Sequence, residues 1–325
     1  MERLSQRATF LIFAISLVFQ GLLCAQDLNV ARQLFTDRKY DESARIFSSV
    51  AKGSPAYAES RYYLGQIATR KSDLKNAEKY LEEAVAADQK NARYHQALGA
   101  AYGQIAMSGG PLKQASYAGK IKSCFELAAK FDPNDLTSRW MLFAFYLYAP
   151  KVMGGSPEKA TSTASELLRI NPAEGNRALG MIHQRNDRND LAERYFKMAV
   201  NLAPDSLKHH SQLGSFYQSV ANYDQAWVVY DKALTRFPGS RSLLYESGKV
   251  SALSGKNLAT GEKALNDYIN GSGTRESRNV ASAYYYLGLI EKSKGNKSAA
   301  RKQFEQALKL NPDHKPSQEA IKESL

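Results

Sequence analysis

The sequence predicts an all-α protein made of repeated pairs of antiparallel helices, and two observations lead to this prediction. First, Leu-Gly pairs recur at one fixed offset in two series, at Leu64-Gly65 and Leu98-Gly99, and again at Leu179-Gly180 and Leu213-Gly214. Second, a small residue usually occupies the twelfth place after the glycine, a large side chain comes four places later, and an alanine three after that. A fixed period of about 34 residues indicates a repeat protein.

The pattern within each unit fits two helices in close contact. Spacings of three and four residues place apolar side chains on one helix face, and glycine and alanine allow two helices to approach closely. The unit from Leu207 to Ser240 is the most complete, with Leu213, Gly214, Tyr217, Ala226, Tyr230, Ala233 and Pro238 in register. Proline stops the second helix of several units, at Pro55, Pro133, Pro172, Pro204, Pro238 and Pro312.

About eight units follow one another along the chain. Tyr40, Phe47 and Pro55 fit the second helix of an opening unit, whose first helix must be short. Further units begin near residues 58, 92, 136, 173 and 207, and two more follow. Insertions interrupt the period within AMSGGPLKQASYAGK, within YAPKVMGGSPEKA and at NGSGTRES, residues 270–277. The polar segment 313–325 is expected to form the capping helix that an open stack of repeats requires.

These spacings and residue types resemble the tetratricopeptide repeat family, and the resemblance covers nearly all of the chain after residue 25. It implies an all-α, right-handed superhelical solenoid of antiparallel helix pairs over residues 26–312. It also implies a non-catalytic scaffold for protein-protein interaction, which holds a peptide or a partner helix in a concave groove.

The resemblance also implies which residues line that groove, because the family uses four places on the first helix of each unit. These places hold Tyr62, Gln66, Arg93, Gln96, Trp140, Arg177, Gln184, Lys208, Ser211, Gln218, Tyr245, Lys249, Tyr285 and Lys292. Aromatic residues mixed with Arg and Lys are typical of peptide-binding surfaces. A solvated helix face is the alternative for any one of them. Tyr102, Tyr146, Tyr217 and Tyr230 fall at packing positions and are expected in the core.

The composition excludes several classes of protein. With 43% hydrophobic residues among 325, the chain is not intrinsically disordered, and its two cysteines, Cys24 and Cys124, allow no disulfide framework. Motifs for nucleotide binding, serine hydrolases and zinc proteases are missing, so we expect no catalytic residue and no cofactor. Five scattered histidines predict no metal site and are expected on helix surfaces.

Two glycine pairs, Gly109-Gly110 and Gly154-Gly155, lie in the first two insertions, and each precedes a lysine. A widened turn between two helices explains them, and Ser156 before Pro157 fits the start of a helix. An anion site at a helix N-terminus is the alternative. An enzyme would need catalytic groups in these insertions.

Residues 1–25 predict an export signal. A basic start with Arg3 and Arg7 precedes an apolar run from Ala8 to Leu23, which is short for a membrane-spanning helix. Cleavage after Ala25 would place the protein in the bacterial periplasm. A retained membrane anchor and lipidation at Cys24 are the alternatives.

The net charge is +12, and cationic residues gather near the C-terminal end of the chain, including Lys294, Lys297, Arg301 and Lys302. Such a run is usually a solvated helix face. Alternatively, this basic patch makes the protein a carrier or assembly factor that binds anionic polymers of the cell envelope. An export signal argues against nucleic acid as a partner.

Overall fold

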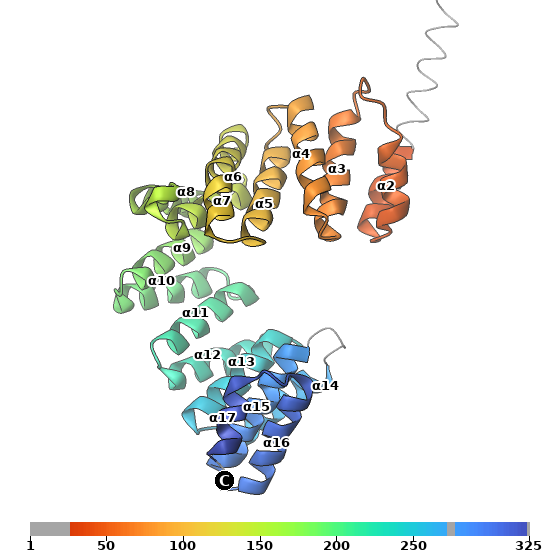
Figure 1. Ribbon diagram of the computed structural model, residues 1–325. Coiled ribbons are helices and arrows are strands. Elements are labelled where there is room, and N and C mark those ends of the chain that lie inside the picture. Colours follow the sequence, from red (N-terminus) through yellow and green to blue (C-terminus); the bar gives the residue numbers. More distant parts are fainter. Residues whose placement is uncertain (1–26, 272–276, 324–325) are drawn as a thin grey trace, which may run out of the picture. The chain divides into compact units, whose positions relative to one another are not determined.

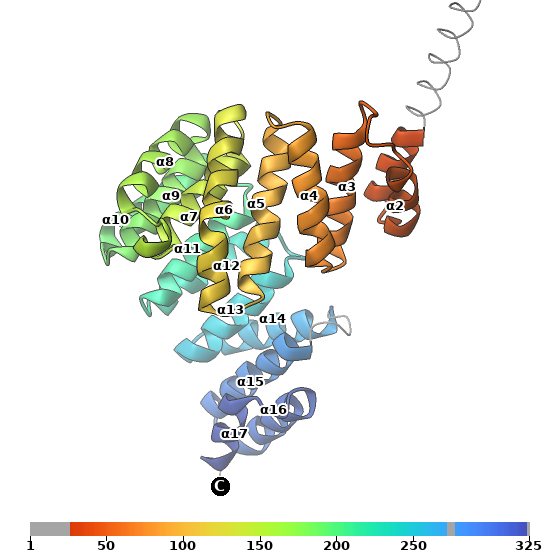
Figure 2. The same cartoon turned by 45° about the horizontal axis from the view of Figure 1, so that its top comes forward.

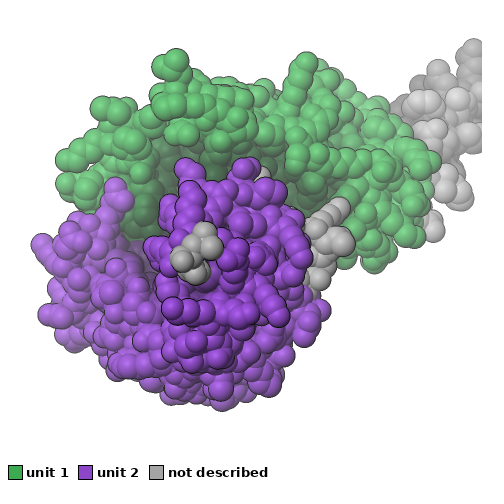
Figure 3. All heavy atoms as spheres, turned by 60° about the horizontal axis from the view of Figure 1, so that its bottom comes forward, with its two compact units in different colours: residues 1–166 green, residues 167–325 purple. Residues whose placement is uncertain are grey.

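The computed structural model describes residues 27–271 and 277–323, and every regular element in these ranges is a helix (Figure 1). The predicted all-α fold is therefore confirmed. The chain forms two compact units, residues 1–166 and 167–325, which Figure 3 colours separately. Within each unit, successive helices pair with their neighbours along the chain.

The first unit holds four helix pairs. The opening pair is a helix at residues 27–36 with α2 (Tyr40–Ser48). The next pairs are α3 (Tyr57–Arg70) with α4 (Leu74–Ala87), α5 (Ala92–Met107) with α6 (Pro111–Phe131), and α7 (Leu136–Tyr148) with α8 (Pro157–Ile170). A short 3-10 helix, η1 (Lys151–Met153), lies between α7 and α8, whose last turn enters the second unit.

The second unit continues the series with four more pairs and a last helix. The pairs are α9 (Pro172–Arg185) with α10 (Asn189–Leu202), α11 (Leu207–Ser219) with α12 (Tyr223–Arg236), α13 (Arg241–Ser254) with α14 (Leu258–Asn270), and α15 (Ser277–Ser293) with α16 (Lys297–Leu310). The last helix is α17 (Lys315–Lys322), which packs on α16.

Glycines of the Leu-Gly pairs lie where the two helices of a pair come closest. A Cβ atom added to Gly65 would lie 2.5 Å from Leu81 Cγ, and one added to Gly180 would lie 2.6 Å from Phe196 Cδ1. The large residues that fill these contacts, including Leu81, Phe196, Tyr230 and Phe304, are almost completely buried. The glycine therefore recurs once per repeat because the two helices of a pair are too close at that position for a larger residue.

The turn between the two helices of a pair repeats its backbone conformation as well. Ser72, Asp187 and Ala221 have φ +60°, +56° and +54°, and Gly255, at the same place one repeat after Ala221, has φ +69°. In the second insertion, Gly154 has φ +99° and Gly155 approaches the carbonyl of Ala149 so closely that no side chain fits. The Ser156 hydroxyl then accepts a hydrogen bond from the Lys159 amide (3.2 Å), so this glycine pair forms the turn that starts α8.

Candidate binding surface on the first helices

The predicted groove residues bring successive first helices of the second unit into contact. Gln184 Nε2 on α9 donates a hydrogen bond to Ser219 Oγ on α11 (3.0 Å). Gln218 Nε2 on α11 donates to Glu246 Oε2 on α13 (2.7 Å). Residues about one repeat apart in sequence are thereby placed side by side. We call this surface, formed by α9, α11, α13 and α15, the first-helix face of the second unit.

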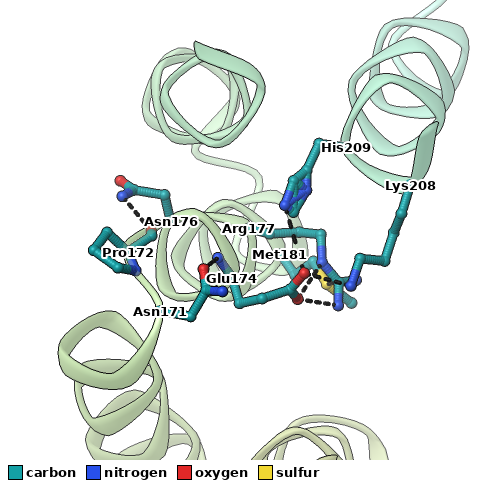
Figure 4. A network of polar contacts seen from close by, with 8 residues as sticks. All are labelled: Asn171, Pro172, Glu174, Asn176, Arg177, Met181, Lys208 and His209. Atoms are coloured by element: carbon teal, nitrogen blue, oxygen red, sulfur yellow. Dashed lines mark hydrogen bonds and ion pairs between the residues drawn. The ribbon is translucent and has the colours of Figure 1, made fainter. Parts of the chain in front are cut away.

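An ion cluster around Glu174 joins α9 to α11 on this face (Figure 4). The Glu174 side chain is buried, and its Oε2 accepts hydrogen bonds from Arg177 Nε (3.0 Å) and Nη2 (2.7 Å). Its Oε1 pairs with the Lys208 ammonium and lies 3.5 Å from His209 Nε2. Asn171 holds the start of α9, because its side chain accepts from the Glu174 amide (3.1 Å). A buried carboxylate is thus matched by two cations.

The charges in this cluster are set by burial and by the two cations. Burial alone would raise the pKa of Glu174, but hydrogen bonds from Lys208 and Arg177 outweigh burial and leave that pKa below its usual range. Burial lowers the pKa of His209 to about 4. At neutral pH, Glu174 is therefore ionised and His209 is neutral. Arg177, a predicted groove residue, is buried and forms an ion pair with Glu174.

Two open cavities lie beside each other on the same face, and Glu246 borders both. One, of about 360 Å³, is lined by Ser215, Gln218, Ser219, Tyr223, Lys249 and Leu253 in addition to Glu246. The other, of about 410 Å³, is lined by Arg241, Ser242, Tyr245, Tyr268 and Asn279. Glu246, which borders both cavities, forms an ion pair with Lys249 of the first one, with 3.3 Å between Lys249 Nζ and Glu246 Oε2. Three predicted groove residues, Gln218, Tyr245 and Lys249, line these cavities.

Aromatic rings form one wall of the second cavity and continue onto α15. The Tyr245 ring packs against Tyr268 and Tyr286, with centroids 5.2 and 5.9 Å away. The Arg241 guanidinium lies 4.8 Å from the centroid of Tyr268. Tyr285 packs between Phe304 and His314. Lys292, at the last predicted place, pairs with Glu323 (3.2 Å).

The first unit places its predicted residues in similar contacts. Tyr62 packs against Tyr94, with centroids 5.2 Å apart, and the Arg93 guanidinium lies 5.1 Å from the Tyr62 centroid. Gln96 Nε2 donates to Oδ2 of Asp135, the residue that caps the start of α7 (2.9 Å). The other two are Gln66, which accepts from Arg70 (3.1 Å), and Trp140, whose ring centroid is 5.1 Å from that of Phe143.

Half of the predicted basic patch is neutralised by neighbouring carboxylates. Lys294 pairs with Glu262 and with Glu291, and Arg301 pairs with Glu305 (3.1 Å). Lys297 and Lys302 are exposed and form no ion pair within residues 27–271 and 277–323. The patch therefore offers two uncompensated cations.

The expectation that the histidines lie on helix surfaces is wrong for His95, His209 and His210, which are buried. His95 Nε2 lies 2.8 Å from the Gln89 carbonyl oxygen, and His210 Nε2 lies 2.8 Å from that of Pro204. Both rings thus bind a carbonyl six residues earlier, in the loop that enters their own helix. The sequence signal for this burial was that each histidine follows, by six residues, a residue in the loop before its own helix.

Among the described residues, no group of His, Cys, Asp and Glu is arranged to hold a metal ion.

Glu174 was not among the predicted residues, although the repeat gives a signal for it. It lies one full repeat before Lys208, and therefore at the same place in the preceding unit.

No helix in the described ranges has the length and apolar character needed to cross a membrane.

Sequence models of the tetratricopeptide repeat match residues 34–101 and 281–314. The chain is 28% identical over 170 residues to anaphase-promoting complex subunit 3 of Schizosaccharomyces pombe, which is 52% of this chain and 24% of that protein. It is 26% identical over 134 residues to the human protein O-mannosyl-transferase TMTC1, which is 41% of this chain and 14% of that protein. The matched regions thus span a quarter or less of these relatives.

Among solved structures, a tetratricopeptide repeat protein from Parabacteroides merdae has a similar fold, with a TM-score of 0.50 and 17% identity. The similarity covers 82% of this chain and 98% of that chain.

Proposed function

Because this chain belongs to the tetratricopeptide repeat family, whose repeats form protein-protein interaction scaffolds, we propose that it binds a segment of a partner protein on the first-helix face of the second unit. The role we propose is binding without catalysis. The O-mannosyl-transferase relative does not change this proposal, since only 14% of that protein is matched.

The pair of cavities that share Glu246 is the observation that carries the proposal. Together they form two neighbouring pockets lined by tyrosine, amide and hydroxyl side chains. Tyrosine offers a large contact area at a low cost in conformational entropy, and amides and hydroxyls bind peptide groups. Glu246 compensates the charge of Lys249, and the Arg241 guanidinium lies against the Tyr268 ring, so the residues that line the two cavities carry a net charge of only +1. We therefore propose an extended segment with little net charge as the ligand.

Filling the two cavities with a larger side chain is the test of this function. Ser242→Trp and Leu253→Trp each place an indole in one cavity from an exposed position on α13. Wild-type and doubly substituted chains are used to capture proteins from an extract of the source cells. Partner segments found by cross-linking and mass spectrometry are then synthesised, and their affinity is measured by fluorescence anisotropy. We expect the double variant to bind such a segment at least about tenfold more weakly.

A matched double variant controls for the added tryptophans. Arg194→Trp on α10 and Thr235→Trp on α12 introduce the same side chain at exposed positions on second helices. This variant should bind the segment like the wild type, and all chains should show the same helical circular dichroism. Equal affinity for the cavity variant and the control would contradict the proposed site.

We propose a cell-envelope location from the export signal in residues 1–25, which lie outside the described residues. Mass spectrometry of the protein recovered from cells measures this directly, because a cleaved chain should begin at Gln26. A full-length chain recovered with membranes would indicate an anchor instead. The basic patch is a weaker candidate for binding an envelope polymer, because carboxylates compensate Lys294 and Arg301.

A further inference from the structure

The two insertions of the first unit expose aliphatic side chains far more than the rest of the chain does. Met107 and Leu112, at the α5–α6 turn, are 82% and 90% exposed, and Val152, in η1, is 94% exposed. No other large apolar side chain in the described ranges exceeds 54%. Extra residues that a repeat adds to its loops commonly serve binding, because the helix pairs themselves pack without them.

The two turns lie at the same end of neighbouring helix pairs. Consecutive helices in the series run antiparallel, so the α5–α6 turn and the α7–α8 segment are both turns between the two helices of a pair. The 3-10 helix η1 contacts α6, and the hydrocarbon chain of Lys122 in the middle of α6 lies against Gly154, about 15 Å along the helix from Leu112. α6 is the longest helix in the described ranges, with 21 residues, and it runs beside α5 in both ribbon views (Figure 2).

The α5–α6 turn has no acidic residue, and the α7–α8 segment has none before Glu158 in the first turn of α8. Residues 89–125 and 136–157 contain no Asp or Glu, although the whole chain holds 32. Lys113 follows Leu112, and Lys151 precedes Val152. Both lysines are exposed, and neither forms an ion pair within the described residues. Tyr148, 54% exposed, lies three residues before Lys151. Each turn therefore combines an exposed aliphatic side chain with an exposed lysine. Lys151 interacts electrostatically with Glu158 in the first turn of α8.

We propose that the α5–α6 and α7–α8 turns dock on the surface of a membrane that contains anionic lipids. Exposed aliphatic side chains at projecting turns can enter a bilayer interface, where apolar burial and attraction to anionic lipids act together. Lysine binds anionic headgroups while its hydrocarbon chain stays in the apolar region, and tyrosine is enriched at the same depth. The charge of the turns complements such a surface. The residues of these turns belong to the first unit and are distinct from those of the first-helix face of the second unit.

Fluorescence of single substitutions measures whether these turns enter a bilayer. Full-length chains in which Trp140 and Trp227 are replaced by phenylalanine carry Leu112→Trp or Val152→Trp and are mixed with phosphatidylcholine vesicles, with or without phosphatidylglycerol. The matched control is Val228→Trp on α12, 50% exposed in the second unit. We expect the tryptophans at 112 and 152 to shift to shorter wavelength and to be quenched by brominated acyl chains when phosphatidylglycerol is present. The tryptophan at 228 should change little.

Vesicle co-sedimentation then measures how much the two turns contribute to the affinity of the protein for phosphatidylglycerol vesicles. Leu112→Glu with Val152→Glu should weaken partition into phosphatidylglycerol vesicles about tenfold or more, and Val228→Glu with Leu202→Glu should not. Because residues 1–25 are present in every chain, any binding through them is common to all variants. Tryptophans at 112 and 152 that stay exposed to water on vesicle-bound protein would overturn the proposal. If Leu112→Glu with Val152→Glu instead abolished self-association of the chain without lipid, the turns would be a contact between copies, and the proposal would also fail.

Discussion

At the scale of single residues, the best-defined polar feature of the protein is the ion cluster around Glu174. A buried carboxylate remains ionised only because Arg177 and Lys208 bind both of its oxygens. The two cations differ in surroundings, since the Arg177 side chain is 9% exposed and that of Lys208 is 54% exposed. They should therefore contribute differently to stability.

Removing the carboxylate should destabilise the second unit more than removing the exposed cation. Glu174→Ala removes the carboxylate that binds the buried Arg177 guanidinium, and we expect a loss of about 3 kcal/mol. Lys208→Ala should cost less than about 1 kcal/mol, because its ammonium is half exposed. Urea unfolding of the two variants measures the difference. The double variant Glu174→Leu with Arg177→Leu should be more stable than Glu174→Ala, and equal losses for all of the variants would contradict the buried ion pair.

His209 should make the fold sensitive to mild acid. Burial lowers the pKa of His209 to about 4 from the model-peptide value of 6.5, so between these pH values only the unfolded chain binds the proton. Stability should therefore fall as the pH decreases from about 6.5 to about 4, by about 2 to 3 kcal/mol. Below about pH 4.5, Glu174 adds a further loss, because its own pKa is lowered in the folded state.

The variant His209→Phe separates this effect from general acid unfolding. His209 Nδ1 has no hydrogen-bond partner among the described residues, and Nε2 lies 3.5 Å from Glu174 Oε1, so phenylalanine keeps the ring in place and removes only that contact. Urea midpoints measured from pH 7 to pH 4.5 should fall less steeply for the variant than for the wild type. Parallel curves would show that His209 does not titrate in this range.

At the scale of helices, the contact between the two helices of a pair is set by a glycine and one large side chain. On α9, Gly180 faces Phe196, whose ring is buried and packs 5.5 Å from the ring of Phe216. An added methyl group has no space there, because both rings are held by the core. Gly103, on α5, has no atom within 4 Å of an added Cβ.

The same substitution should therefore have opposite effects at these two glycines. Gly180→Ala should destabilise the protein by about 1 to 3 kcal/mol through overpacking against Phe196. Gly103→Ala should stabilise it by up to about 1 kcal/mol, since alanine favours a helix interior more than glycine does. Thermal unfolding followed by circular dichroism measures both changes. A loss of similar size at both positions would mean that helix propensity, and not the close contact, decides the outcome.

At the scale of the whole molecule, the hydrophobic core is a series of small clusters. One cluster includes Phe196, Phe216 and Tyr230, and another includes Leu265, Tyr268 and Ile290. Separate clusters on α2–α3 and on α4–α6 serve the first unit. Each helix pair thus buries its apolar face mainly against its neighbours, which is the energetic pattern of a repeat protein.

A local defect should therefore stay local. We expect Gly180→Ala to increase hydrogen exchange in α9, α10 and α11, and to leave exchange in α3, α4 and α5 as in the wild type. Hydrogen-deuterium exchange with mass spectrometry resolves these helices as separate peptides. Increased exchange throughout both units would indicate one cooperative core instead of a series.

The sequence by itself determined the all-α repeat fold. Leu-Gly pairs, alanines and prolines at fixed offsets describe contacts within one helix pair, and such contacts join residues close in sequence. The core tyrosines Tyr102, Tyr146, Tyr217 and Tyr230 were predicted for the same reason, and all four are buried.

Only the tertiary structure decided which polar residues are available to a partner. Arg177 looked like a groove cation, but Glu174 on its own helix and Lys208 on the next first helix complete a buried cluster around it. His95 and His210 looked exposed, but their rings turn inward to bind loop carbonyls. The period specifies the helix on which a side chain lies. Its burial and its partner depend on neighbours from the next repeat, whose side chains vary while the packing positions remain the same.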